Sequence, residues 1–215
     1  MDLKGCIFDL DGVIVDTAKY HFMAWRRLAK ELGFEFTLED NEALKGVSRM
    51  ASLEILLAKG GVHATEKEKE EFAARKNGWY VEFISGMTPD EILPGSVKLL
   101  KALRKDGILT AIGSASKNAG TILDGIGLRS MFDVIIDGNK IHKAKPDPEV
   151  FLKGAEEMQL PPSACIVFED AQAGIEAAIA GGMKCIGVGS PGLLGRADLV
   201  IPDLSKITIK QLRNL

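Results

Sequence analysis

The chain has 215 residues and a mass of 23.2 kDa, which suits one globular domain of ordinary size or one domain that carries an insert. Hydrophobic residues make up 46% of the sequence and charged residues 27%, a balance that excludes a disordered chain, a collagen and a coiled coil. The net charge of −3 supplies no basic field, so we expect neither nucleic acid nor a membrane surface as a partner.

The three cysteines, Cys6, Cys165 and Cys185, each lie in a short apolar run, as small buried hydrophobic residues do. The first residues do not have the pattern of a targeting peptide, and no apolar stretch approaches the ~20 residues of a membrane span. We therefore expect a protein of the reducing cytoplasm. Nothing in the sequence marks an obligate interface, so we expect a monomer.

The predicted elements change character twice along the chain. The first is a buried strand over residues 5–10, an apolar run that ends in the turn signal Asp11-Gly12. Helical spacing then dominates from residue 19 to about residue 86, with helices predicted over residues 22–32, 51–58 and 67–84. Beyond Pro94 the two types alternate: we expect strands over 108–113, 134–136, 164–168, 185–188 and 199–201, and helices over 97–105, 119–126, 148–158 and 173–180.

Strands that alternate with helices are typical of an α/β fold in which a doubly wound parallel sheet is covered by helices on both faces. The helical stretch that interrupts this alternation predicts a small all-helical insert after the first strand. We expect a core made of residues 1–14 and 90–215 and an insert made of residues 15–89. In such sheets ligands bind beyond the carboxyl ends of the strands, which is where chemistry should be sought.

Polar residues that could carry chemistry follow the predicted strands. In chain order these are Asp9 and Asp11, Ser114, Lys145, and Glu169 with Asp170. Taken singly, each could be a helix cap, a turn residue or a surface residue. Their joint occurrence at the carboxyl edge of one predicted sheet favours a catalytic site instead.

The set suits phosphoryl transfer. Asp9 can attack phosphorus and form an aspartyl-phosphate, while Asp11 can protonate the leaving oxygen and deprotonate the next acceptor. The carboxylates of Asp9 and Asp170 are hard oxygen ligands of the kind that Mg²⁺ prefers. Ser114 and Lys145 can hold the phosphate oxygens as charge spreads over them.

These four motifs resemble those of the haloacid dehalogenase superfamily of phosphotransferases, from Gly5 to about Gly189, and the insert resembles its small helical cap. Residues 17–25, 44–49, 75–77 and 114–118 are similar to a family of sugar phosphomutases within it. The resemblance implies an enzyme that interconverts beta-glucose 1-phosphate and glucose 6-phosphate through a bound 1,6-bisphosphate. The expected partner is therefore a small sugar phosphate.

The resemblance also implies roles for individual residues. Mg²⁺ would be bound by Asp9, the main-chain carbonyl of Asp11 and Asp170, with Glu169 alongside. Arg49, Lys117 and Asn118 would hold the phosphate at the far end of the sugar. The full expected substrate-binding set is Thr17, His21, Trp25, Lys45, Gly46, Val47, Ser48, Arg49, Ser52, Lys76, Ala115, Ser116, Lys117 and Asn118.

Two other functions are compatible with the core motifs. A capped phosphatase would use the same acids but would pass the phosphoryl group from a small sugar phosphate to water. A non-enzymatic signalling receiver would only store an aspartyl-phosphate, and it would need neither the length nor the insert of this chain. His21, Arg49 and Lys76 favour the mutase, because a closing cap that contributes its own anion clamp can exclude water while a sugar hydroxyl attacks.

Overall fold

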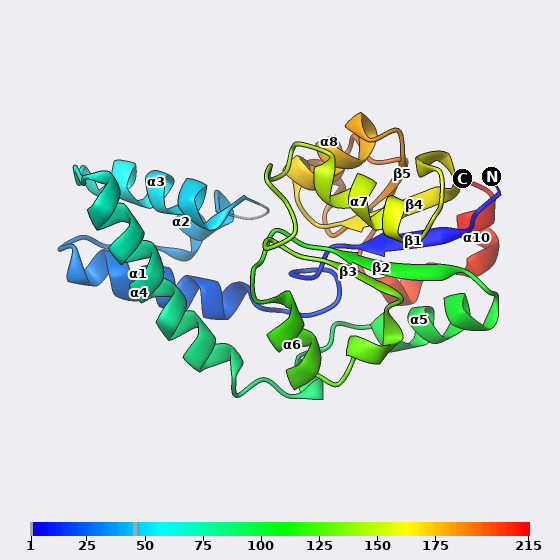
Figure 1. Cartoon of the computed structure of the whole chain (residues 1–215), viewed down its shortest axis with the longest axis horizontal. Helices are drawn as coiled ribbons and strands as arrows, with labels where there is room; N and C mark the ends of the chain where they lie inside the picture. The colour runs from blue at the N-terminus through cyan, green and yellow to red at the C-terminus, as the bar shows by residue number, and fades with distance from the viewer. Residues whose placement is uncertain (1, 45–46) are drawn as a thin grey trace.

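The structure is a computed structural model that describes residues 2–44 and 47–215. Within these residues one parallel sheet runs in the order β3-β2-β1-β4-β5-β6 (Figure 1). Its strands are β1 (Gly5–Phe8), β2 (Leu109–Gly113), β3 (Val134–Ile136), β4 (Cys165–Glu169), β5 (Lys184–Val188) and β6 (Leu199–Ile201). This confirms the predicted parallel sheet, with β1 in its middle and paired to both β2 and β4.

Helices cover both faces of the sheet. On one face lie α5 (Ser96–Lys105), α6 (Ala119–Gly125) and α10 (Ile209–Arg213), and on the other α7 (Glu149–Glu157) and α8 (Gln172–Ala180). Neighbouring β1 residues therefore enter different cores: Phe8 stacks on Phe168 with ring centroids 4.6 Å apart, while Ile7 belongs to the cluster around Phe151. Burial on both faces explains why the strand is an uninterrupted apolar run.

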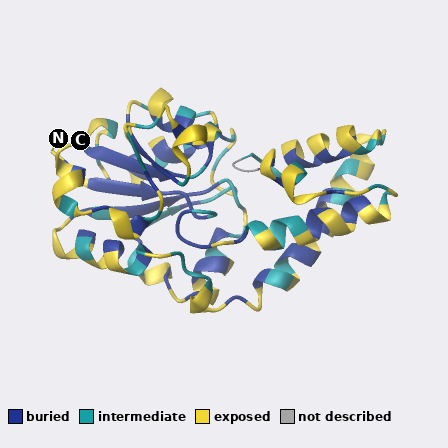
Figure 2. Ribbon diagram, turned by 180° about the vertical axis from the view of Figure 1, so that it is seen from behind, coloured by how far each residue is buried: buried dark blue, intermediate teal, exposed yellow. Residues whose placement is uncertain are grey.

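Four helices form a separate group beyond the carboxyl ends of the strands (Figure 1). They are α1 (Ala18–Glu31), α2 (Leu38–Glu42), α3 (Arg49–Gly60) and α4 (Glu66–Ile84). Trp25 and Leu28 of α1, Leu56 of α3 and Tyr80 of α4 are buried in one apolar cluster. The inner sides of these helices are buried and their outer sides exposed, as Figure 2 shows, so the four helices pack against one another through their apolar sides.

Several boundaries differ from the prediction because caps, which periodicity does not detect, set them. Helix α3 begins at Arg49 because the Ser48 side chain accepts the main-chain N–H of Ala51. The pattern missed α2, α9 (Pro191–Leu194) and α10, which are too short to show a helical period. It also missed the 3₁₀ turns η1 (Pro89–Glu91), η2 (Arg129–Met131), η3 (Pro162–Ala164) and η4 (Leu204–Lys206).

The two chain segments that link the helical group to the sheet run side by side. Val15 and Ile92 form an antiparallel bridge between them. Glu91 accepts hydrogen bonds from the Lys19 ammonium at 2.5 Å and from the Tyr20 hydroxyl at 2.7 Å. These contacts hold the two links against each other. None of the helices in the described residues is both long and apolar enough to cross a bilayer.

Candidate active site

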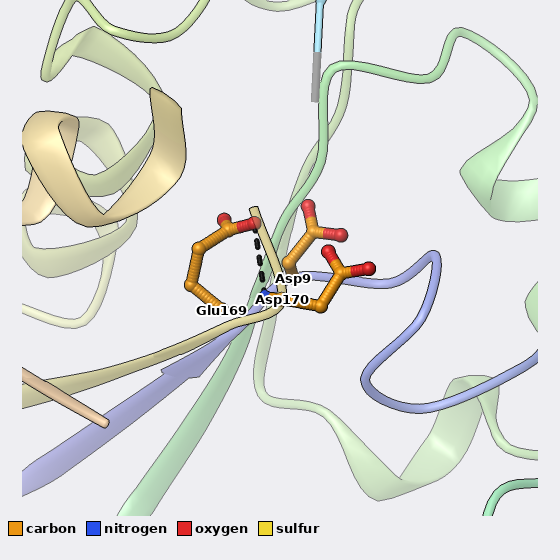
Figure 3. Close-up of side chains that lie close together, drawn as sticks. All are labelled: Asp9, Glu169 and Asp170. Atoms are coloured by element: carbon orange, nitrogen blue, oxygen red, sulfur yellow. Dashed lines mark hydrogen bonds between the residues drawn. The ribbon is translucent and has the colours of Figure 1, made fainter. Parts of the chain in front are cut away.

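The core acids meet because β1 and β4 are adjacent and in register. Phe8 pairs with Phe168, so Asp9 follows β1 next to Glu169, the last residue of β4, and Asp170. Their carboxylates gather at the sheet edge (Figure 3), and one ligand atom from each lies within 4.8 Å of the others. The sequence-predicted acids of the two motifs are therefore brought together.

Lys145 joins this cluster from the loop between β3 and α7. Its Nζ donates to Asp9 Oδ1 at 2.5 Å and to Glu169 Oε2 at 2.8 Å, and all three side chains are buried. Burial alone would lower the pKa of Lys145, but the charges and hydrogen bonds of the two carboxylates outweigh it and raise that pKa above its ordinary value. Lys145 therefore stays protonated.

Glu169 is held on both of its oxygens. While Oε2 accepts from Lys145, Oε1 accepts the main-chain N–H groups of Asp170 at 3.2 Å and Ala171 at 3.0 Å. Burial raises the pKa of Glu169 to about 7, and the Lys145 charge opposes that rise. The side chain thus ties the lysine to the turn that carries Asp170.

Asp11 lies beside the cavity rather than in the buried cluster. Its carboxylate accepts a hydrogen bond from the Thr17 hydroxyl. Burial, followed by the negative charge of Asp9, raises the pKa of Asp11 to about 6, although the Thr17 bond opposes the rise. A carboxyl with a pKa near neutrality can both give and take a proton, which is what a general acid and base must do.

Gly12 makes room for the carboxylate cluster of Asp9, Glu169 and Asp170. It has a φ of +85°, and a Cβ atom there would lie only 2.1 Å from Asp170 Oδ2. Only glycine combines this backbone conformation with such a close approach. The three carboxylates are hard oxygen donors, so the described residues fit a divalent metal ion at this position.

The loop after β2 is organised by its own hydroxyl groups. Ser114 is buried, and its Oγ accepts the main-chain N–H of Ser116 at 3.0 Å. Ser116 Oγ in turn accepts the N–H of Asn118 at 3.2 Å. The Asn139 amide supports the loop from outside, donating to the Lys117 carbonyl at 3.0 Å.

The cap side contributes cations over aromatic rings. Lys76 is buried, with its Nζ 3.0 Å from His21 Nδ1, 4.4 Å from the Trp25 ring centroid and 4.7 Å from that of Tyr80. Burial, and then the nearby Arg49 charge, lower the pKa of Lys76 to about 7. Burial and the charge of Lys76 lower the pKa of His21 well below its ordinary value.

One cavity of about 960 Å³ lies between core and cap. The sequence-predicted residues that line it are Asp9, Asp11, Thr17, His21, Trp25, Val47, Ser48, Arg49, Ser52, Lys76, Ser114, Ala115, Ser116, Lys117, Asn118, Lys145 and Asp170. Glu169 lies in the buried cluster instead, and Lys45 and Gly46 lie outside the described residues.

Sequence reasoning missed other residues of the cavity wall. Asn41, Met50, Asn77 and Tyr80 all line it. Tyr80 packs against His21, with the two ring centroids 4.1 Å apart. Asn77 lies in the stretch 75–77 that resembles the sugar phosphomutases, and this resemblance was the signal in the sequence that pointed to it.

Comparison with known proteins identifies the protein family. The sequence model of the haloacid dehalogenase-like hydrolases matches residues 3–182. The chain therefore belongs to this family, as its motifs predict, and the parallel sheet with a helical cap is the fold expected of it.

Individual relatives narrow the comparison beyond the family. The chain is 42% identical to the beta-phosphoglucomutase of Bacillus subtilis (strain 168), over 98% of this chain and 94% of that protein. It matches the crystal structure of a beta-phosphoglucomutase from Clostridium difficile with a TM-score of 0.94 and 41% identity, over 99% of this chain and 96% of that one. It is also 33% identical to the fructose-1-phosphate phosphatase YqaB of Escherichia coli (strain K12), over 86% of this chain and 95% of that protein.

Proposed function

We propose that this chain is a beta-phosphoglucomutase, which interconverts beta-D-glucose 1-phosphate and D-glucose 6-phosphate through beta-glucose 1,6-bisphosphate. The observation that carries the proposal is a cavity that has carboxylates and Lys145 on its core wall and Arg49, Lys76 and His21 on its cap wall. A bisphosphate that turns round between two half-reactions needs two anion sites of different kind. Similarity to two beta-phosphoglucomutases supports the same conclusion.

In one half-reaction a carboxylate oxygen of Asp9 attacks a phosphorus atom of the bisphosphate. The new oxygen–phosphorus bond forms as the bond from phosphorus to the sugar oxygen breaks, and Asp11 gives its proton to that oxygen. The product is an aspartyl-phosphate at Asp9 and a free sugar hydroxyl. The raised pKa of Asp11 supports this role, because the carboxyl can hold a proton near neutral pH.

The other half-reaction reverses these roles: beta-glucose 1-phosphate takes the phosphoryl group from Asp9 and becomes the bisphosphate, which then turns end for end. Asp11 takes the proton of the attacking sugar hydroxyl, whose oxygen bonds to phosphorus as the bond to Asp9 breaks. Throughout, the Lys145 ammonium and the Ser114 hydroxyl hold the non-bridging oxygens of the transferring group. The hydrogen bond from Lys145 to Asp9 also orients the nucleophile.

The metal ion proposed for this site is Mg²⁺, held by Asp9, the main-chain carbonyl of Asp11 and Asp170, with Glu169 alongside. When bound, it supplies positive charge that offsets the repulsion between the attacking carboxylate and the phosphate. Asp11→Asn should therefore slow phosphoryl transfer without weakening Mg²⁺ binding, because only its main-chain oxygen is assigned to the metal. A large drop in Mg²⁺ affinity, measured by titration, would contradict that assignment.

The helical group, residues 15–89, is proposed to act as a cap that closes over the core, residues 1–14 and 90–215. Arg49, with Lys117 and Asn118, would hold the phosphate that is not being transferred. A guanidinium presents paired N–H donors that match two phosphate oxygens. Closure would keep water away from the aspartyl-phosphate while a sugar hydroxyl attacks it. The adjacent links at Val15 and Ile92 are suited to act as a hinge.

One incubation tests the proposal directly. The protein is mixed with Mg²⁺, beta-glucose 1-phosphate and a catalytic amount of beta-glucose 1,6-bisphosphate, and both glucose 6-phosphate and free phosphate are followed. We expect many turnovers to glucose 6-phosphate with little free phosphate. Release of phosphate as the main product would instead establish a sugar phosphatase, the activity that the name of the YqaB relative gives. No turnover of either kind would leave only a phosphate-storing receiver.

A further inference from the structure

A hydrogen bond joins the cap to the core across the cavity. Asn118 Nδ2, on the core loop after β2, donates to Oδ1 of Asn77, on helix α4 of the cap, at 3.0 Å. Both residues line the cavity, and both are partly buried. Asn118 is one of the residues proposed above to hold the second phosphate, whereas Asn77 has so far no role.

Helix stability does not explain Asn77. It lies inside the 19-residue helix α4 and is followed by Gly78, where an added Cβ atom would meet nothing within 4 Å. Asparagine and glycine both have low helix propensity, and Gly78 is not required by crowding. An alanine at position 77 would favour the helix more. The residue therefore has to be explained by what its side chain contacts.

The contact involves the donor side of the Asn118 amide. A primary amide carries two N–H donors on one atom and a carbonyl acceptor on the other. If Asn118 turned by half a rotation, its carbonyl oxygen would face any phosphate there and would repel it. In the observed arrangement Asn77 Oδ1 accepts one N–H of Asn118, and the second N–H on the same nitrogen is left to point elsewhere.

We propose that Asn77 is a positioning residue for the second phosphate, because its carbonyl holds the Asn118 amide with an N–H donor presented to the cavity. The inference rests on the proposed function of Asn118. It adds that the bond links the helix of Lys76 to the loop of Lys117, so it sets the separation of these cap and core cations when the cap is closed.

A double-mutant cycle tests the inference. KM and kcat for beta-glucose 1-phosphate are measured for Asn77→Ala, Asn118→Ala and the double variant, with saturating Mg²⁺ and bisphosphate. Asn77→Ala should raise KM about 3- to 10-fold, the range expected for one hydrogen bond, and should change kcat less than about twofold. In the Asn118→Ala background the same change should have almost no further effect, because nothing is left to position.

Asn139→Ala is the matched control. Asn139 also donates an amide hydrogen bond to this loop, but to the Lys117 carbonyl rather than to the Asn118 side chain. Any effect of Asn139→Ala should therefore multiply with that of Asn118→Ala. Thermal unfolding checks that the variants fold, which we expect of Asn77→Ala because alanine favours the helix.

The possible failures can be told apart. If Asn118→Ala alone leaves KM unchanged in an active enzyme, the proposed phosphate role of Asn118 is wrong, and the role of Asn77 falls with it. If Asn118→Ala raises KM but Asn77→Ala does not, only the inference about Asn77 is overturned. The same holds if the two effects simply multiply, because Asn77 then acts independently of the amide that it contacts.

Discussion

The two walls of the cavity are built in opposite ways. On the core wall, Asp9, Lys145 and Glu169 are buried and bonded to one another, each beyond a strand or in a loop anchored by the sheet. On the cap wall, Arg49 and Lys76 come from two different helices. Among the residues that the structure describes, neither forms an ion pair with a carboxylate.

Under the proposed function, this difference separates the residues of phosphoryl transfer from those of substrate recognition. A buried network whose members satisfy one another is rigid, and rigidity is what the attacking carboxylate and the groups around phosphorus require. Cations without carboxylate partners leave positive charge that an entering phosphate can satisfy. Changes in the core wall should therefore mainly lower kcat, and changes in the cap wall should mainly raise KM.

The largest expected effect is that of Asp9→Asn. An amide cannot attack phosphorus, so kcat should fall by at least about 10⁴-fold. The folded state should persist, because Lys145 keeps Glu169 as a partner. Turnover and thermal unfolding of the variant check both statements. Substantial residual turnover would mean that another group is the nucleophile.

Gly12→Ala should have the next largest effect. Its Cβ atom would lie 2.1 Å from Asp170 Oδ2 and would displace that carboxylate from the cluster. We expect activity to fall by about 10²-fold and the Mg²⁺ concentration for half-maximal activity to rise, by analogy with the loss of a metal-orienting contact.

Gly61→Ala is the control for Gly12→Ala. Gly61 also has a positive φ, of +62°, but an added Cβ atom there would meet nothing within 4 Å. It should cost about 1–2 kcal/mol of folding free energy from backbone strain and leave the Mg²⁺ dependence unchanged. If both variants shift the Mg²⁺ dependence equally, strain rather than displacement of Asp170 is the cause.

Arg49→Ala tests the cap wall. Losing the guanidinium should lower kcat/KM for beta-glucose 1-phosphate by about 10²-fold, mainly through a higher KM, because a charge-assisted contact to the second phosphate is lost. Hydrolysis of a small generic phosphate ester, which has no second phosphate, should change far less. Equal losses in the two assays would mean that Arg49 does not act as an anion clamp.

The core wall was predictable from sequence for a physical reason. In a parallel sheet all strands end at the same edge, so finding the strands is enough to bring Asp9, Ser114 and Asp170 together. The family resemblance predicted from these motifs is confirmed by the family match and the relatives. Even Lys145, in a loop, lies where the resemblance led us to expect it.

The cap wall was less predictable because no such rule applies to helices. Which side of α4 faces the core depends on how α1 and α3 pack against it. The spacing of hydrophobic residues within α4 alone does not predict this packing. That Asn77 and Tyr80 lie on the cavity wall therefore became apparent only in the structure. The short helices α2 and α10 were missed as well, although Thr37 and Thr208 begin capping boxes that could have revealed them.

The smallest expected effect concerns the stability of the cap wall. Lys76 has a pKa of about 7 in the folded protein against an ordinary value of 10.5, because burial and the Arg49 charge disfavour its protonated form. Between these two pH values the unfolded chain binds a proton that the folded chain does not. Folding should therefore become more favourable as pH rises through this window, and the gain attributable to Lys76 should be about 2 kcal/mol between pH 7 and pH 9.

Lys76→Met should remove that pH dependence, because methionine is similar in length and does not titrate. Its free energy of unfolding in urea should exceed that of the wild-type protein most at pH 7, and the gap should narrow by pH 9. Lys67 is exposed on the same helix, so in Lys67→Met the free energy of unfolding should change with pH as it does in the wild-type protein. If the free energy of unfolding of Lys76→Met also depends on pH as in the wild-type protein, Lys76 is charged in the folded protein. The Trp25 and Tyr80 rings 4.4 and 4.7 Å away would then stabilise the ammonium enough to offset its burial.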